Sequence, residues 1–156
     1  MKTLPLLLLL ISILFFGCVS NTQDTLINQN TSTTLSQNSS VNGNITVEIY
    51  HFHGTNQCYS CIKVGELAEK TVNTYFKDEL ESGKLVFAHI NGELPENQDL
   101  VNKYGVTGSS LWIGTYVNGK FYKEQNINVW YKIDNEKEYL DYLKSILERR
   151  LSGGLN

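Results

Sequence analysis

The feature that most constrains the fold is an apolar segment that ends shortly before two closely spaced cysteines. Residues 45–52 read ITVEIYHF. They are rich in β-branched and aromatic residues and apolar on both faces, which predicts a central strand covered on both sides. After a short polar loop come Cys58 and Cys61, and apolar residues then recur at helical spacing to about residue 82. The cysteines are therefore predicted to lie where a buried strand gives way to a helix.

The other predicted elements complete an α/β domain over residues 45–152. Two strand–helix–strand crossovers imply parallel strands, and an Asn-Gly pair implies an antiparallel hairpin at one edge. The expected order is strand, helix, strand, helix, strand, strand, helix, which gives a small mixed sheet with helices on both faces. The later elements are a strand at 84–91, a helix at 97–105, strands at 110–117 and 120–125, and a helix from Asn135.

Composition limits the classes of function. The chain has 156 residues, of which 41% are hydrophobic, and a formal net charge of −3. That suits one domain with an ordinary core. No basic patch stands out, so nucleic acid is not expected as a partner. No cofactor is expected either.

The first 18 residues are predicted to be an export signal. One Lys, an apolar run and Gly17 precede Cys18, and this order is typical of such signals. A cysteine after a small residue also resembles the lipobox of secreted lipoproteins, in which the cysteine sulfur carries lipid. An uncleaved signal anchor and plain secretion remain alternatives. Each of the three places the rest of the chain outside the cytoplasmic membrane, and the first two at its outer face.

Residues 19–44 are predicted to be a flexible polar tether. They consist mostly of Ser, Thr, Asn and Gln, with few apolar residues. Such a segment cannot bury enough apolar surface to offset its chain entropy.

The cysteine pair has the spacing and setting of a redox motif. The start of a helix offers unpaired N–H groups and the positive end of the helix dipole, which stabilise a thiolate at Cys58. Cys58 is therefore the expected nucleophile. Cys61, one turn later, is the expected resolving thiol and disulfide partner. Tyr59 and Ser60 between them are expected to tune the reduction potential.

These residues resemble the thioredoxin superfamily. The resemblance rests on the element order, on CYSC at the strand–helix junction, and on KYGVTGSSLWIGTYVNGK at residues 103–120. It implies a thioredoxin-like fold and thiol–disulfide exchange with exported protein thiols or disulfides, or with a membrane electron donor. YHFHGT at residues 50–55 also resembles the ArsF-type group of short exported thioredoxin-like proteins. The names of that group link it to arsenic or nitro-compound reduction.

The chain departs from the family at two points. Thioredoxins place a cis-proline in the loop that faces the cysteines, whereas Ser109 and Ser110 stand there in this chain. A cis bond without proline costs about 3 kcal/mol, so a trans or reshaped loop is expected, with both serines facing the cysteines. The family's buried aspartate has no clear match. Glu48, His51 and His53 are the candidate proton carriers, and strand alternation places the two histidines on one face and Glu48 on the other.

Other readings of the cysteines stay open. A metal carrier would use Cys58, Cys61 and His53, because two thiolates and one imidazole suit Cu(I) or Zn. A non-catalytic partner subunit would use the fold only for interaction. A purely structural disulfide is a third reading, although a disulfide that closes so short a loop stabilises the fold little. His89, in the second strand, is expected to be structural. Gly65 is expected at a close contact or a kink, because glycine costs about 1 kcal/mol within a helix.

Overall fold

The computed structural model describes residues 44–155. The predicted export signal with Cys18 and all but the last residue of the predicted tether lie outside this range. The strands are β1 (Ile45–His53), β2 (Leu85–Asn91), β3 (Ser110–Val117) and β4 (Lys120–Gln125); the helices are α1 (Tyr59–Tyr75), α2 (Lys77–Glu81), α3 (Gln98–Tyr104) and α4 (Glu136–Leu151). None of the helices within residues 44–155 has the length and apolar character that a membrane crossing requires.

The four strands form one mixed sheet in the order β2-β1-β3-β4. β1 pairs in parallel with β2 and antiparallel with β3, and β3 pairs antiparallel with β4. Asn118 and Gly119 adopt φ values of 52° and 76° in the turn of the last hairpin. Positive φ at both central positions is what a tight hairpin turn requires, which explains the Asn-Gly pair. The predicted central position of the first strand and the predicted antiparallel edge are both confirmed.

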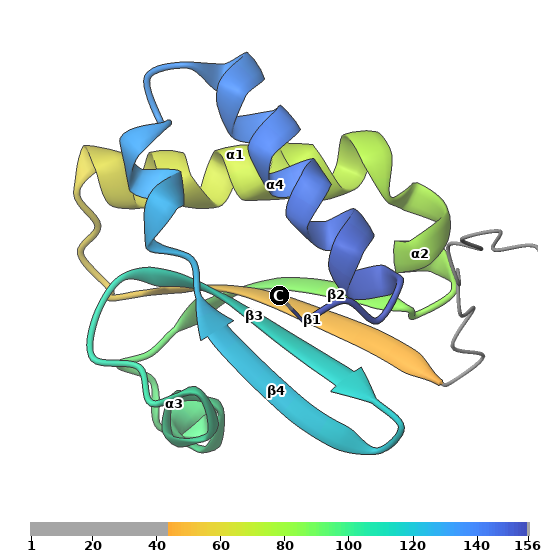
Figure 1. The fold of residues 1–156 in the computed structure, drawn as a ribbon. Helices are drawn as coiled ribbons and strands as arrows, with labels where there is room; N and C mark the ends of the chain where they lie inside the picture. Colours follow the sequence, from red (N-terminus) through yellow and green to blue (C-terminus); the bar gives the residue numbers. More distant parts are fainter. Residues whose placement is uncertain (1–43, 156) are drawn as a thin grey trace, which may run out of the picture. The chain divides into compact units, whose positions relative to one another are not determined.

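Helices cover both faces of this sheet (Figure 1). α1 and α4 lie over one face and α3 lies under the other. Alternate residues of β1 serve the two sides, because Val47 and Ile49 pack in the core under α1 and α4, whereas Tyr50 and Phe52 pack with α3. The predicted α/β arrangement, a small mixed sheet with helices on both faces, is thus confirmed, and β1 is shared by two separate cores.

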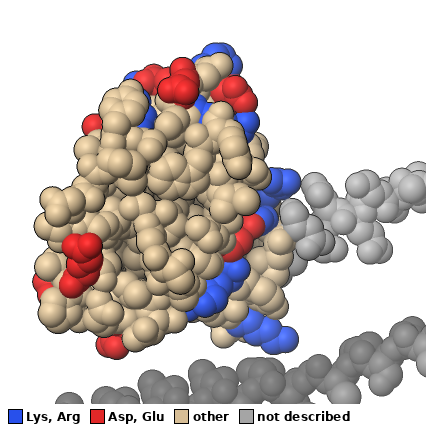
Figure 2. Space-filling view, turned by 90° about the vertical axis from the view of Figure 1, so that its left-hand side faces the viewer, with Lys and Arg blue, Asp and Glu red and all other residues tan. Residues whose placement is uncertain are grey.

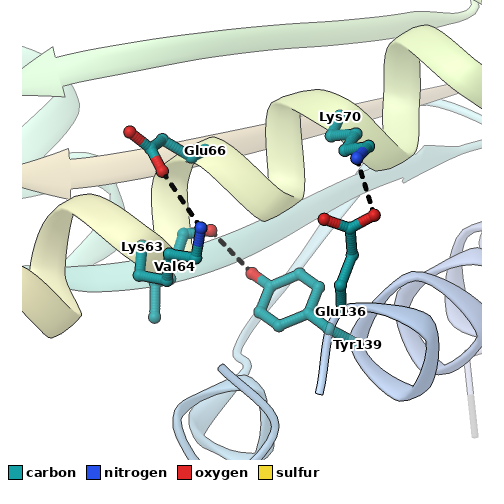
Figure 3. A network of polar contacts seen from close by, with 6 residues as sticks. All are labelled: Lys63, Val64, Glu66, Lys70, Glu136 and Tyr139. Carbon is teal, nitrogen blue, oxygen red and sulfur yellow. Dashed lines mark hydrogen bonds and ion pairs between the residues drawn. The ribbon is translucent and has the colours of Figure 1, made fainter. Parts of the chain in front are cut away.

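Polar contacts fix α4 against the first half of α1 (Figure 3). The buried Tyr139 hydroxyl donates a hydrogen bond to the Val64 carbonyl, with 2.7 Å between the oxygens. Lys70 and Glu136 form an ion pair at 2.6 Å nearer the middle of α1. Burial raises the pKa of Tyr139, which keeps the hydroxyl protonated as a donor. These contacts hold in place the part of α1 that begins with the cysteines.

The prediction of one helix from the cysteines to about residue 82 is wrong in one respect, because the helix breaks at Phe76. That residue leaves helical geometry with φ −130° and ψ 33°, and its side chain is buried in the core. α2 then continues as a separate short helix. Two 3-10 segments, Pro95–Asn97 and Ile127–Tyr131, were not predicted. A single 3-10 turn leaves too little periodicity in a sequence to be recognised.

Candidate active site

The two cysteines form a disulfide at the start of α1. Cys58 is the N-cap of the helix, and the Cα atoms of Cys58 and Cys61 are 5.1 Å apart. The backbone N–H of Cys61 donates to the Cys58 sulfur at 3.2 Å, and the Ser60 hydroxyl lies 3.2 Å from the same sulfur. Helix N-terminal N–H groups stabilise negative charge. After reduction, the same contacts would favour the thiolate of Cys58.

The two cysteines differ in accessibility. Cys58 is exposed and Cys61 is half-buried. Tyr59 is 74% exposed and Ile62 is 43% exposed, so apolar side chains extend into solvent next to the pair. Figure 2 views the end of the molecule at which α1 begins, and most of this face carries no charge, with acidic and basic side chains mainly toward its edges. A partner's sulfur can therefore reach Cys58 before Cys61.

All three histidines of the chain gather in front of the cysteine helix. The parallel register pairs His51 on β1 with His89 on β2, and their Nδ1 atoms lie 2.9 Å apart. The ring of His53 stacks on that of His51 with 5.4 Å between centroids. Because residues two apart on a strand point to the same face, β1 presents both of its histidines to α1.

His51 is buried and incompletely hydrogen-bonded. Only 1% of the residue is exposed, and its Nε2 atom makes no hydrogen bond. Burial, followed by the neighbouring His89 and His53, lowers the pKa of His51 to about 4, while the Cys61 backbone acts in the opposite direction. The imidazole is therefore neutral at neutral pH.

Gly65 makes this arrangement possible. A β-carbon at this position would fall only 2.6 Å from Cε1 of His51 and 2.9 Å from Cε1 of His89. Any side chain on α1 at residue 65 would displace the two imidazoles. Of the two predicted reasons for this glycine, the close contact is confirmed, since α1 continues unbroken through it.

His53 lies beside a cavity on the other side of the strand ends. Its Nδ1 atom lies 2.9 Å from the Gly54 carbonyl and donates to it. The cavity, of about 250 Å³, is lined by Phe52, His53, Gly54, Gly92, Glu93, Val101, Val106, Thr107 and Gly108. The Glu93 carboxylate accepts a hydrogen bond from the Thr55 backbone at 2.9 Å, and hydrogen bonding to Thr55 lowers the pKa of Glu93. His53 thus borders both the imidazole cluster and this cavity.

Glu48 lies on the opposite face of the sheet from His51. Its carboxylate accepts a hydrogen bond from the Tyr104 hydroxyl and one from Lys103 Nζ, each at 2.7 Å. Lys103 also donates to the Tyr116 hydroxyl at 2.7 Å. The structure therefore engages Glu48 in a paired network on the α3 side and does not bring it together with the cysteines.

The two serines of the loop before β3 have different surroundings. The Ser110 hydroxyl donates to the Gly108 carbonyl at 2.9 Å and accepts from Trp112 Nε1 at 3.1 Å. Ser110 is buried at the start of β3 opposite Phe52, on the α3 side, so the expectation that it faces the cysteines is wrong. Ser109 is half-buried. No peptide bond within residues 44–155 is cis, which confirms the expected trans linkage between the serines.

The metal-carrier reading gains no support from the geometry. Within residues 44–155, no three or more His, Cys, Asp or Glu side chains are placed so that they could hold one metal ion. The expected set of Cys58, Cys61 and His53 is therefore not assembled with the disulfide closed.

Sequence reasoning missed the part that His89 and Glu69 play in this cluster. His89 bridges the buried His51 and the exposed surface, where its Nε2 lies 3.4 Å from the Glu69 carboxylate. Both histidines precede the end of their observed strands by two residues, but the predicted first strand ended at Phe52, so the sequence alone did not pair them. Glu69, one turn after Gly65 on α1, carries no signal of its own.

Comparisons with known proteins found distant structural likenesses. No family model matches the chain, and no curated protein is detectably similar in sequence. One similar solved structure is that of thioredoxin O2 from Arabidopsis thaliana in the oxidized state. It has a TM-score of 0.41 and 11% identity, and the match covers 67% of this chain and 74% of that one. A malarial protein is similar with a TM-score of 0.36 and 18% identity over 52% and 81% of the two chains. Neither likeness is close enough to carry an argument about activity.

Proposed function

We propose that this protein is a membrane-tethered, extracytoplasmic thiol–disulfide oxidoreductase. The observation that carries the proposal is the placement of Cys58. It is exposed, it caps α1, and it is joined to Cys61 in a disulfide whose partner lies deeper. An accessible sulfur that receives helix N–H groups is the arrangement that makes a cysteine reactive. A disulfide closing so short a loop contributes little to stability, which favours a chemical role over a structural one.

The exchange would proceed in two steps. The Cys58 thiolate attacks one sulfur of a substrate disulfide, which forms a mixed disulfide and releases the first substrate thiolate. Cys61 then loses its proton and attacks the Cys58 sulfur, which closes the Cys58–Cys61 disulfide and releases the second substrate thiolate. Two electrons pass from the protein to the substrate, and the two released thiolates take up protons. The reverse sequence oxidises a substrate dithiol.

The surroundings of the disulfide suit a protein substrate. Tyr59 and Ile62 offer exposed apolar contacts next to the cysteines. The face around them is largely uncharged (Figure 2). Exported protein thiols or disulfides, or the cysteines of a membrane electron donor, are the proposed partners. Reduction of an arsenic or nitro compound is a narrower proposal that rests on the ArsF-type resemblance alone. Arsenate-dependent oxidation of the reduced cysteines would test it.

Trapping of the mixed disulfide tests the activity. A Cys61→Ser chain retains the attacking thiol but cannot resolve the intermediate, so it should accumulate a disulfide-linked adduct with a reducible protein such as insulin. The adduct should disappear on treatment with dithiothreitol. Both variants also carry Cys18→Ser, so that a Cys58→Ser chain retains only the deeper thiol; it is the matched control and should form far less adduct. Equal trapping by both variants, or none by either, would contradict the proposal and leave a non-catalytic interaction domain.

The tether is a separate part of the proposal and rests on sequence. Gly17 and Cys18 form the lipobox-like end of the predicted signal, outside the described residues. Metabolic labelling with a radioactive fatty acid should mark the wild-type chain and not a Cys18→Ser chain. Membrane association without label would instead favour the signal anchor. Release of both chains into the medium would contradict tethering.

A further inference from the structure

We propose that the cavity at the carboxyl ends of β1 and β2 binds a primary ammonium or guanidinium group carried on a short apolar stem. The proposal stands apart from the exchange reaction, because it concerns binding at residues other than the cysteines. The same ligand chemistry occurs in free amines and in the Lys and Arg side chains of proteins, and binding experiments can distinguish these two sources.

The cavity lies where the connections that follow two neighbouring parallel strands part. β1 and β2 pair in parallel, and the chain leaves β1 for α1 on one face of the sheet and β2 for α3 on the other (Figure 1). Such a divergence opens a crevice between the strand ends, and ligands of open α/β sheets bind at these points. Here Gly54, directly after β1, and Gly92 and Glu93, directly after β2, line the cavity of about 250 Å³.

His53 and Glu93 give the cavity wall hydrogen-bond acceptors. His53 donates from Nδ1 to the Gly54 carbonyl, which leaves Nε2 as the acceptor nitrogen of the neutral imidazole. Hydrogen bonding to Thr55, from its side chain and its backbone, lowers the pKa of Glu93 and keeps the carboxylate ionised. A carboxylate has about four lone-pair sites, so Glu93 can also accept from a ligand. Among the lining residues within 44–155, no Lys or Arg opposes this charge, so the wall favours a cation with N–H donors.

The chain around Glu93 holds its carboxylate in place. A β-carbon on Gly54 would fall 2.9 Å from Oε1 of Glu93, so the carboxylate lies against a residue that has no side chain. The Asn91 side chain accepts from the Glu93 backbone N–H at 3.0 Å and donates to the Thr55 hydroxyl at 3.1 Å. These hydrogen bonds join the segment after β1 to the segment after β2. A charge that is positioned before a ligand arrives lowers the ordering cost of binding.

Apolar side chains supply the rest of the match. Phe52 from β1, Val101 from α3 and Val106 from the segment before β3 belong to the lining. Contact with the methylene groups of an alkyl stem removes this apolar surface from water. A metal ion is the less suitable cation, because no three or more His, Cys, Asp or Glu side chains within residues 44–155 are placed to hold one. The occupant that suits both the charge and the apolar wall is an organic cation.

Titration with small cations tests the site. The oxidised, isotope-labelled full-length chain with Cys18→Ser is titrated with n-butylammonium, and the amide signals of Gly54, Gly92 and Gly108 are followed by NMR. These signals should shift to saturation. n-Butyrate, which has a similar stem and the opposite charge, should not shift them. Methylammonium, which lacks most of the stem, should bind about 10-fold more weakly or worse.

Glu93→Gln is the decisive variant. The amide keeps a carbonyl oxygen for Thr55 but loses the charge, so the affinity for n-butylammonium should fall about 10-fold or more. Glu96→Gln removes an exposed carboxylate from the adjoining 3-10 segment that does not line the cavity, and it should leave the affinity within about twofold. Unaltered affinity in Glu93→Gln, equal weakening in both variants, tight binding of n-butyrate, or the absence of saturable shifts would each overturn the proposal.

A lysine derivative distinguishes the two sources of the cation. Nα-acetyl-lysine methylamide presents the same ammonium on a peptide unit. Binding at least as tight as that of n-butylammonium would assign the cavity to a basic side chain of a protein. Exclusion of this compound while n-butylammonium still binds would assign it to a free amine. Nα-acetyl-norleucine methylamide, which carries a similar stem without the charge, is the control and should not bind; binding equal to that of the lysine derivative would overturn the role of the charge.

Discussion

The two faces of the sheet both pack polar groups against β1, but the chain completes their hydrogen bonds on one face only. On the α3 side, Glu48 accepts from Lys103 and from Tyr104 at 2.7 Å each. Burial and the hydrogen bond to Glu48 raise the pKa of Tyr104. On the α1 side, His51 has one partner, His89, and a buried Nε2 with none.

This difference distinguishes a structural network on the α3 side of the sheet from a candidate chemical site on the α1 side. A paired and hydrogen-bonded charge stabilises the arrangement that surrounds it, whereas a buried acceptor without a partner costs free energy. The cost falls on the face of the sheet that α1 covers, and α1 is the helix that begins with the cysteines. The α3 network is therefore interpreted as a structural element, and the imidazole cluster as part of the candidate site.

The largest expected effect concerns acid stability. The folded-state pKa of His51 is about 4 against 6.5 in the unfolded chain. As pH falls from 6.5 toward 4, the unfolded chain binds a proton at His51 and the folded chain does not, so the free energy of unfolding decreases by about 3 kcal/mol. His51→Leu, which cannot titrate, should lose less stability over this window than the wild type. Urea denaturation at several pH values measures it, and parallel curves for the two chains would contradict the low pKa.

The second largest effect on the free energy of unfolding is expected on the α3 side of the sheet, where Lys103 pairs with Glu48. Lys103→Met leaves the Glu48 carboxylate, whose side chain is 17% exposed, with Tyr104 as its remaining partner. Removal of one partner from a buried pair costs about 3–5 kcal/mol, and partial exposure reduces this to about 2 kcal/mol here. The exposed Lys120 on β4 provides the control, and Lys120→Met should change the free energy of unfolding by less than about 0.5 kcal/mol. Equal effects of the two substitutions would show that the α3 network is not stabilising.

The smallest expected effect tests the close contact between Gly65 on α1 and the imidazoles of His51 and His89. Gly65→Ala gains about 1 kcal/mol of helix propensity but forces a methyl group against His51 and His89, which costs about 1–3 kcal/mol. A net loss of about 1 kcal/mol in the free energy of unfolding is expected. Gly108→Ala, where a β-carbon would meet nothing within 4 Å, should be close to neutral. A stabilising Gly65→Ala would contradict the close packing of the cluster on α1.

Local patterns predicted most of the fold. The run of β-branched and aromatic residues in β1, the Asn-Gly turn and the cap of the last helix at Asn135 are short-range signals, and the structure has each of them. The break at Phe76 was not predicted, because no Gly or Pro marks it in the sequence. The same limit applies to Ser110, whose hydroxyl direction depends on the loop and on Trp112.

The sequence predicted the cysteine pair of the candidate site but not the packing of the histidines around it. Cys58 and Cys61 could be paired from their spacing and position. His51 was recognised as a candidate, but its partner His89 was assigned to structure, because the register of β1 and β2 is a long-range property that no local pattern carries.

The central claim is that Cys58 and Cys61 exchange electrons with other thiols. A redox titration tests it most directly. The full-length chain with Cys18→Ser, which contains no other cysteine, is equilibrated with thiol buffers of known potential, alkylated, and analysed by mass spectrometry. A reversible two-electron transition with a midpoint between about −270 and −120 mV is predicted. A pair that stays oxidised below about −300 mV, or does not exchange, would contradict the account and leave a structural bridge.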